Sequence, residues 1–169
     1  MAEFIETRPE AFEKSPFRLI GTDWMLIAAT KDGRTNAMTA SWGGLGRMWN
    51  KDVAFVFIRP QRFTKTLVDG AETFSLTFFG ADYKKMLTYM GSASGRDEDK
   101  IAHSGLTLLH DGDTPYFEEA QAAVLCKKLY AQAMRPDCFL DDTFNAEFYP
   151  GSDHHTLYIA EVTKLLVRA

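Results

Sequence analysis

Several classes of protein are excluded by what this sequence lacks. It has no run of about 20 apolar residues, the length that a membrane-spanning helix needs. Its first residues, MAEFIETRPEAFEK, carry acidic groups where a secretion signal has a basic region and an apolar core. Basic residues are not in excess either, because the net charge is -4, whereas nucleic-acid binding calls for a basic patch. We therefore expect a cytoplasmic protein that binds neither a membrane nor nucleic acid.

Cysteine and nucleotide-binding glycine motifs are also scarce. The sequence has two cysteines, Cys126 and Cys138, whose separation fits neither a CxxC pair nor a metal site. We expect two free thiols, assign them no chemistry and predict no metal. A dinucleotide-binding domain would show a GxGxxG turn between a strand and a helix, and the glycine cluster GGLG at 43–46 lacks this spacing. A doubly wound parallel sheet therefore fits less well than an antiparallel fold.

Many short strands and few helices follow from the hydrophobic pattern. A chain of 169 residues, 46% of them hydrophobic, suits a single domain over 1–169. The Asp32-Gly33 pair predicts a hairpin turn within a strand-turn-strand unit over 24–42. Further strands are predicted over 53–58, 73–79, 123–134 and 156–167, and helices over 62–69, 81–90 and 97–103. This order predicts a mainly β, α+β fold: an antiparallel barrel with helices packed outside.

The segment TNAMTASWGGLGRMWNKD at 35–52 crowds small residues, three glycines and two tryptophans into one stretch. Glycine is a poor choice inside a strand but suits a place where backbone lies close against another group. Thr39 and Ser41 alternate, so on an extended backbone they share a face and can hold one ligand. The alternative is an ordinary edge strand with exposed hydroxyl groups.

Two later segments have the composition of anion sites. In RPQRFT at 59–64, Pro60 favours a turn that opens a helix, whose free N–H groups join the Arg59 and Arg62 guanidinium groups and the Thr64 hydroxyl. The segment SASGRD at 92–97 repeats this pattern of hydroxyl groups, glycine and arginine. The alternative for each arginine is a solvated or ion-paired surface group.

Four motifs, taken in order, resemble the flavin reductase-like family of FMN-binding split barrels, particularly its flavoredoxin-like branch. They are NAMTASWG, RPQRFT, TFSLTFF and SGRDEDK. The resemblance runs from about residue 15 to the end. It implies a six-stranded antiparallel Greek-key split β-barrel with peripheral helices. It also implies a homodimer that holds FMN noncovalently at the subunit boundary.

The resemblance implies one set of FMN-binding residues: Asn36, Met38, Thr39, Ala40, Ser41, Trp42, Arg59, Arg62, Phe63, Thr64, Ser92, Gly95, Arg96 and Lys100. Those from Thr39 to Trp42 would line the isoalloxazine ring, and the set from Arg59 onward would hold the phosphate. Phe63 stands where a tyrosine is frequent in this branch, so no hydroxyl contact is expected there. On this interpretation the small residues let the backbone approach the ring, while Trp42 and Trp49 wall the pocket or, for Trp49, serve packing alone.

The resemblance implies hydride transfer from NADH or NADPH to FMN, followed by release of electrons to a second acceptor. No catalytic residue is required, because the redox chemistry belongs to the cofactor. His155, in Asp153-His154-His155, is a candidate to reach the flavin or the nicotinamide, and the alternative is a surface turn histidine. Three functions remain open: an NAD(P)H-dependent FMN reductase, an electron carrier that serves a redox partner protein, and a nonenzymatic flavin-binding module.

Overall fold

The computed structural model describes residues 3–169, and its centre is one antiparallel sheet. The strands run in the order β3-β2-β6-β9-β10-β5-β4, and β1 pairs with β10 beside this path. A separate hairpin consists of β7 and β8. The strands are β1 (Phe4–Thr7), β2 (Met25–Lys31), β3 (Arg34–Ala40), β4 (Gly43–Met48), β5 (Lys51–Ile58), β6 (Thr73–Phe78), β7 (Leu108–Asp111), β8 (Thr114–Phe117), β9 (Ala122–Ala133) and β10 (Thr156–Arg168).

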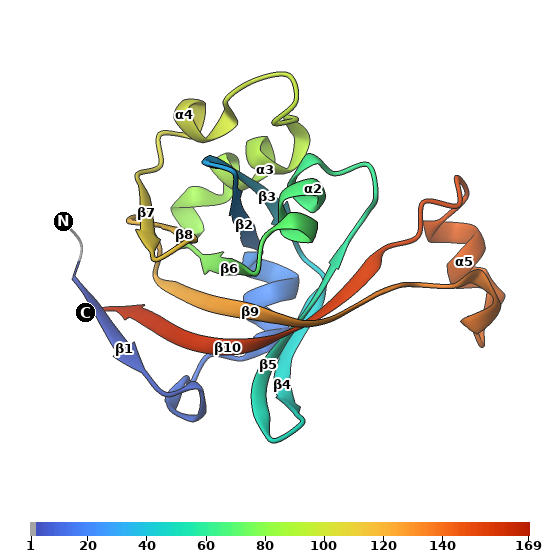
Figure 1. Cartoon of the computed structure of the whole chain (residues 1–169), viewed down its shortest axis with the longest axis horizontal. Helices are drawn as coiled ribbons and strands as arrows, with labels where there is room; N and C mark the ends of the chain where they lie inside the picture. The colour runs from blue at the N-terminus through green and yellow to red at the C-terminus, as the bar shows by residue number, and fades with distance from the viewer. Residues whose placement is uncertain (1–2) are drawn as a thin grey trace.

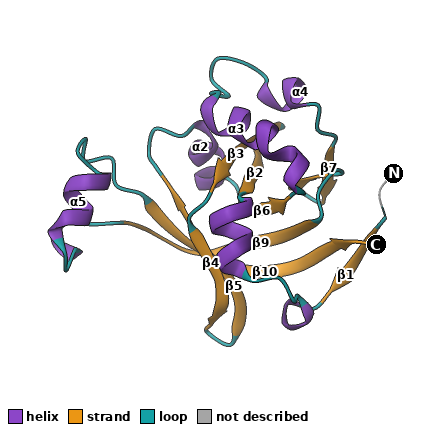
Figure 2. Cartoon of the chain, turned by 180° about the vertical axis from the view of Figure 1, so that it is seen from behind, coloured by secondary structure: helices purple, strands orange, loops and turns teal. Residues whose placement is uncertain are grey.

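Helices lie outside this sheet. Figure 1 shows α2, α3 and α4 together on one side of the long strands β9 and β10, with α5 at the far end of these strands. The view from behind shows helical structure next to β4 (Figure 2). The helices are η1 (Pro9–Ala11), α1 (Pro16–Arg18), η2 (Leu19–Asp23), α2 (Phe63–Gly70), η3 (Ala81–Tyr83), α3 (Lys84–Ser92), α4 (Lys100–Ser104), η4 (Pro136–Cys138) and α5 (Asp142–Phe148). None of those within residues 3–169 is long and apolar enough to cross a membrane.

The main core packs against one face of the sheet, because side chains alternate between the two faces along its strands. Ile27 on β2, Val56 on β5, Phe74 on β6 and Tyr158 on β10 are fully buried in it. The hairpin between β2 and β3 turns at Asp32 and Gly33, whose φ angles of 50° and 74° suit the tight turn that the sequence predicts.

All six predicted strands are confirmed as β2, β3, β5, β6, β9 and β10, but the main sheet holds eight strands because β1 and β4 join them. The sheet does not close, since β3 and β4 lie at opposite ends of the strand order. The predicted helix over 62–69 is α2, and the one over 81–90 is η3 followed by α3. The predicted helix over 97–103 begins later, at Lys100, because Asp99 caps its first turn by accepting a hydrogen bond from the Ala102 amide.

The interpretation of the glycine cluster was wrong. The segment from Gly43 to Met48 is strand β4, paired along its length with β5. Gly43 has a φ of +149°, and a Cβ there would lie 2.5 Å from the carbonyl oxygen of Phe55. Gly43 therefore lets β4 lie close against β5, and the close approach that it permits is to backbone of the same sheet.

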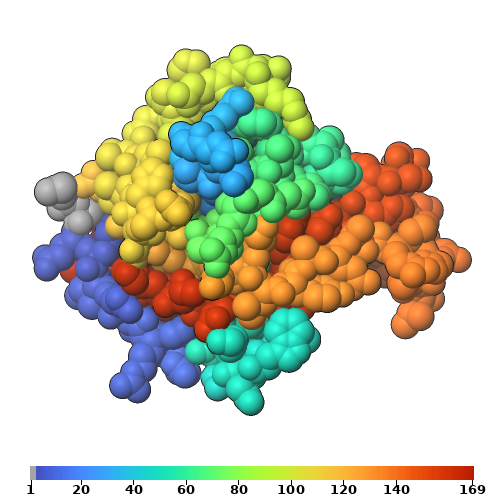
Figure 3. Space-filling model, viewed as in Figure 1, coloured from blue at the N-terminus to red at the C-terminus, as the bar shows by residue number. Residues whose placement is uncertain are grey.

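The ends of β9 and β10 project from the body of the molecule. Residues 134–155 connect them and carry η4 and α5, which form the protrusion on the right of Figure 3. The two thiols are free, as predicted: Cys126 is buried in β9, and Cys138 is exposed in η4 on the protrusion. Burial raises the pKa of the Cys126 thiol.

Candidate functional site

A hollow of about 270 Å³ lies where the end of β3 meets the end of β5 and the start of β10. The residues that line it are Met38, Thr39, Ala40, Ser41, Trp42, Phe57, Arg59, Arg62 and His155. The structure therefore brings the predicted ring-binding segment together with two predicted phosphate-binding arginines. It adds Phe57 from β5, and the candidate His155, which directly precedes β10, also lines the hollow.

One of the two tryptophans walls this hollow. The Trp42 ring lies 5.5 Å from the Phe148 ring and 5.2 Å from the His155 ring, and it remains partly exposed. Trp49 is not part of the hollow, because it forms the β4–β5 turn with a φ of 53° and contacts Tyr130 at 6.4 Å. Of the two alternatives left open for Trp49, the structure therefore agrees with packing alone.

The hydroxyl groups of Thr39 and Ser41 have different surroundings. Thr39 donates a hydrogen bond of 2.5 Å to the carbonyl oxygen of Leu87 in α3, so its proton is used within the protein and only its lone pairs remain for a ligand. Ser41 lines the hollow next to Trp42. Ser41 is therefore the hydroxyl group better placed to donate to a bound ring.

His155 is a buried, neutral histidine rather than a surface turn residue. Its Nδ1 lies 2.7 Å from the Tyr149 hydroxyl group. Burial, with a smaller contribution from Arg59, lowers the pKa of His155 to about 4. When the Tyr149 hydroxyl donates to Nδ1, the proton of the neutral ring sits on Nε2, which leaves an N–H group for the hollow.

Four basic side chains meet around the loop that follows α3, and each donates to backbone carbonyl groups. Arg62 donates to Gly91 at 2.7 Å, and Arg96 to Gln61 at 2.8 Å. Lys100 donates to Met90 at 2.8 Å and to Ala93 at 3.0 Å, and Arg34 to Gly95 at 2.6 Å. We call Arg34, Arg62, Arg96 and Lys100 the basic cluster.

Among residues 3–169, no carboxylate lies within salt-bridge distance of any member of the basic cluster. Burial, and then the positive charges of the basic cluster and its surroundings, lower the pKa values of two of its members. Burial, then the nearby Arg59, lowers the pKa of Arg62. Burial, then the charge of Arg62, lowers the pKa of Lys100 to about 8, although Glu98 opposes this shift. An anion at the cluster would relieve this repulsion.

Arg59 has a different environment, although the sequence predicts the same role for it as for Arg62. Its guanidinium forms an ion pair with Asp153 at 2.5 Å, donates to the Phe148 carbonyl at 2.8 Å and lies 5.0 Å from the centre of the Tyr149 ring. Arg59 is therefore already neutralised, and it ties the end of β5 to the segment that carries α5.

Some of the predicted site residues are enclosed in this structure. Asn36 donates a hydrogen bond of 2.8 Å to the Thr64 hydroxyl, and both side chains are buried. Gly95 is packed so tightly that a Cβ would lie 2.3 Å from Asn36 Oδ1 and 2.9 Å from the Phe63 ring. Ser92 ends α3 and donates to the carbonyls of Thr88 and Tyr89, both at 3.1 Å. These residues shape the loop that holds the basic cluster.

Arg34 is the residue of this region that sequence reasoning missed. Its guanidinium lies 4.3 Å from the centre of the Phe63 ring, and that of Arg96 lies 5.3 Å from the same ring. The hydrogen bond from Arg34 to the Gly95 carbonyl joins the start of β3 to a loop 61 residues later in the sequence. In the sequence, Arg34 is recognisable only as an arginine beside the Asp32-Gly33 turn, and such a position is equally typical of a solvated side chain.

The arrangement fits a flat ring attached to an anion. The hollow has an apolar wall, an exposed indole and polar donors, which are the groups that hold a planar polar ring. Arg62 lines the hollow and also belongs to the basic cluster, so the two parts are joined by one side chain. Guanidinium and ammonium groups without carboxylate partners favour a phosphate.

The chain belongs to the flavin reductase-like family, because the flavin reductase like domain matches residues 17–169. No curated protein matches it significantly.

Solved structures share the fold. An FMN-binding domain of a flavin reductase-like enzyme from Shewanella baltica is 19% identical over 99% of this chain and 78% of that chain, with a TM-score of 0.72. Flavoredoxin from Desulfovibrio vulgaris (Miyazaki F) is 22% identical over 96% and 76%, with a TM-score of 0.67. An FMN-binding protein from Thermus thermophilus, with bound p-hydroxybenzaldehyde, is 24% identical over 94% and 76%, with a TM-score of 0.66. The predicted split-barrel fold and flavin reductase-like family are confirmed.

Proposed function

We propose that this protein is an FMN-binding oxidoreductase that uses NADH or NADPH to reduce flavin and passes the electrons to a second acceptor. The observation that carries the proposal is the continuity between the hollow and the basic cluster through Arg62. A site for a ring alone would not need an adjoining group of cations without carboxylate partners. The family supplies the cofactor class that fits both parts.

Each part of the site has a role on this proposal. Met38, Ala40 and Trp42 bind the flat ring, and Ser41 and backbone groups hold its polar edge. Arg62, Arg96 and Lys100, joined by Arg34, hold the phosphate. When bound, FMN supplies the capacity to accept a hydride and to release electrons.

On this proposal, His155 positions the molecule that exchanges electrons with the flavin ring. The Tyr149 hydroxyl donates to Nδ1 on the same proposal, so the Nε2–H group of His155, which lines the hollow, is a neutral donor. A neutral imidazole can donate to a nicotinamide carboxamide or another carbonyl group without placing a charge beside the ring. Trp42 packs against the same imidazole and limits its movement.

An absorption experiment tests the proposal. The purified protein is mixed with FMN, excess FMN is removed by gel filtration, and NADH or NADPH is then added without oxygen. We expect retained flavin and loss of its visible absorption band with one or both nucleotides. The rates of bleaching show which nucleotide is preferred.

The other outcomes are distinct. Flavin that stays bound and is reduced by neither nucleotide, but by a reduced redox protein, would favour the electron carrier of the flavoredoxin type. Flavin that binds but does not pass electrons to any acceptor after photoreduction would favour a nonenzymatic binding module. A protein that retains no FMN would refute the site.

We also propose that the protein is a homodimer. The projecting part of the chain exposes large apolar side chains: Leu129 and Tyr130 on β9, and Leu140 and Phe144 around α5. Exposed apolar groups gathered on one protrusion favour contact with another chain. Sedimentation velocity of the unchanged protein and of a Leu140→Asp, Phe144→Asp double variant tests this, because the variant should dissociate to a monomer.

A further inference from the structure

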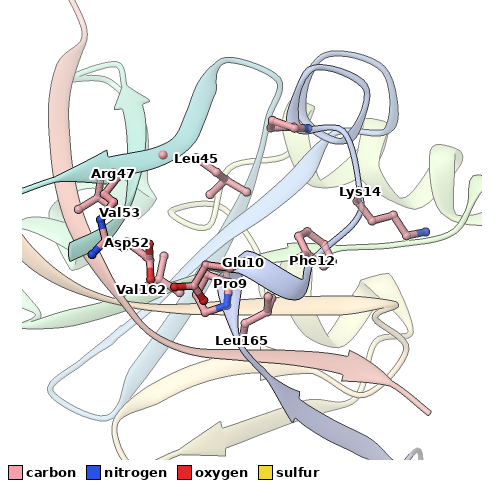
Figure 4. Close-up of a pocket in the computed structure, with 13 residues that line it drawn as sticks. Pro9, Glu10, Phe12, Lys14, Leu45, Arg47, Asp52, Val53, Val162 and Leu165 are labelled. Atoms are coloured by element: carbon pink, nitrogen blue, oxygen red, sulfur yellow. Dashed lines mark hydrogen bonds and ion pairs between the residues drawn. The ribbon is translucent and has the colours of Figure 1, made fainter. Parts of the chain in front are cut away.

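A second cavity lies away from the candidate flavin site and shares no lining residue with it. It has a volume of about 290 Å³ and lies between the N-terminal segment and strands β4, β5, β9 and β10 (Figure 4). It is lined by Pro9, Glu10, Phe12, Lys14, Pro16, Leu45, Gly46, Arg47, Asp52, Val53, Val124, Val162 and Leu165.

The inner surface of this cavity is apolar. Val53, Val124 and Leu165 form its floor and are almost completely buried, with 1 to 2% of their surface exposed. Phe12 and Leu45 are only partly buried, and they pack against the same core from the N-terminal segment and from β4. An apolar molecule here would cover the partly exposed side chains and extend the core, which is favourable in proportion to the apolar area removed from water.

The charged side chains that line the cavity are two basic and two acidic residues. Arg47 forms an ion pair with Asp52 at 3.1 Å and donates to the Asn50 carbonyl at 3.3 Å. Lys14 and Glu10 are exposed, and Figure 4 shows the Lys14 amine directed away from the other labelled side chains. A charged ligand would lose its hydration without gaining a buried partner, so the lining selects a neutral one.

The volume limits the size of the ligand. An apolar cavity of roughly 150 Å³ holds one benzene molecule, and small-molecule sites begin at roughly 300 Å³. The cavity here has about 290 Å³. It therefore has room for a molecule of two fused rings or of similar bulk.

We propose that this cavity is a binding site for a neutral, apolar molecule about the size of two fused rings, separate from the flavin site. The proposal does not depend on the proposed function, because none of the residues that line this cavity belongs to the hollow or to the basic cluster.

Methyl NMR of the full-length protein with indole as the probe tests the proposal. We expect saturable shifts of the Val53, Val124 and Leu165 methyl signals. Filling the cavity by Val162→Phe should weaken indole binding at least tenfold. The matched control is Val167→Phe, which adds the same side chain to the same strand outside the lining and should leave binding unchanged.

Three results would overturn the proposal. Methyl signals of the floor that do not move with indole would show that the cavity takes no such ligand. Shifts confined to the Met38 methyl would place indole in the flavin hollow instead. If the Val162→Phe variant is a monomer in sedimentation velocity while the unchanged protein is a dimer, a second copy of the chain covers the cavity. If Val162→Phe does not fold, Leu45→Trp replaces it, because Leu45 is only partly buried.

Discussion

Replacing Arg62 by alanine separates the two halves of the proposed FMN site. The Arg62 guanidinium lines the hollow, donates one hydrogen bond to the Gly91 carbonyl and has no carboxylate partner among residues 3–169. Its remaining N–H groups are free to donate to an anion. A hydrogen bond to a charged group contributes about 1.5–3 kcal/mol, so Arg62→Ala should weaken FMN binding by roughly 10- to 150-fold.

Riboflavin provides the internal control, because it has the same ring as FMN and no phosphate. Fluorescence titrations at fixed low salt should show similar riboflavin affinity for the unchanged protein and for Arg62→Ala. Arg62→Lys keeps the charge and should recover part of the FMN affinity, while losing the planar geometry of the guanidinium. Arg47→Ala removes an arginine on β4 that pairs with Asp52 and should change neither affinity.

Two results would refute this reasoning. If Arg62→Ala binds FMN as tightly as the unchanged protein does, the phosphate lies elsewhere. If the variant loses riboflavin as strongly as FMN, Arg62 supports the shape of the hollow rather than the phosphate, because its bond to Gly91 would then be its main contribution.

Three further predictions follow from single residues. The pKa of Lys100 is about 8 in the protein without FMN, and a bound anion would raise it, so FMN affinity should fall as pH rises above 8. In titrations from about pH 7 to 10, FMN binding by Lys100→Met and riboflavin binding by the unchanged protein should each be independent of pH. The pKa of His155 is about 4 when folded and 6.5 when unfolded, so the unfolded chain binds more protons and stability should fall by about 3 kcal/mol as pH drops from 6.5 to 4. Urea unfolding of the unchanged protein against His155→Gln measures this loss, and equal losses would contradict it. Gly95→Ala places a Cβ 2.3 Å from Asn36 Oδ1 and should destabilise the fold by about 1–3 kcal/mol in thermal unfolding, whereas Gly21→Ala, with open space around it, should not.

The strands were predictable where local composition and tertiary environment agree. The β-branched and aromatic segment VAFVFI forms the inner part of β5, and the Asp32-Gly33 turn joins β2 to β3 as expected. Strand β4 was missed because GGLG has low strand propensity, and Gly43 is required by its close approach to the Phe55 carbonyl oxygen, which the sequence does not display. A turn is determined by neighbouring residues in the sequence, whereas the close approach of two strands depends on residues from both strands.

The site was predictable to the same extent. Residues 38–42 are consecutive, so a local pattern could indicate that they share one surface, and the structure places them in one hollow. Arg62, Arg96 and Lys100 were predicted through the family resemblance, but Arg34 was not, because it contacts Gly95 across 61 residues of sequence. The burial of His155 likewise depends on Tyr149, which the segment around α5 brings back over the start of β10.

Arg59 and Arg62 show why the spacing of residues does not decide their roles. Both flank Pro60 in a segment that reads as an anion site, and both line the hollow. Arg59 is neutralised by Asp153, so an added phosphate there would have to compete with a carboxylate. Arg62 donates to the Gly91 carbonyl and has no carboxylate partner within residues 3–169, so it retains its net charge. The favourable energy of binding an anion is therefore concentrated at Arg62 and the basic cluster. Arg59 instead anchors the segment that carries Tyr149, and through Tyr149 it keeps His155 at the edge of the hollow.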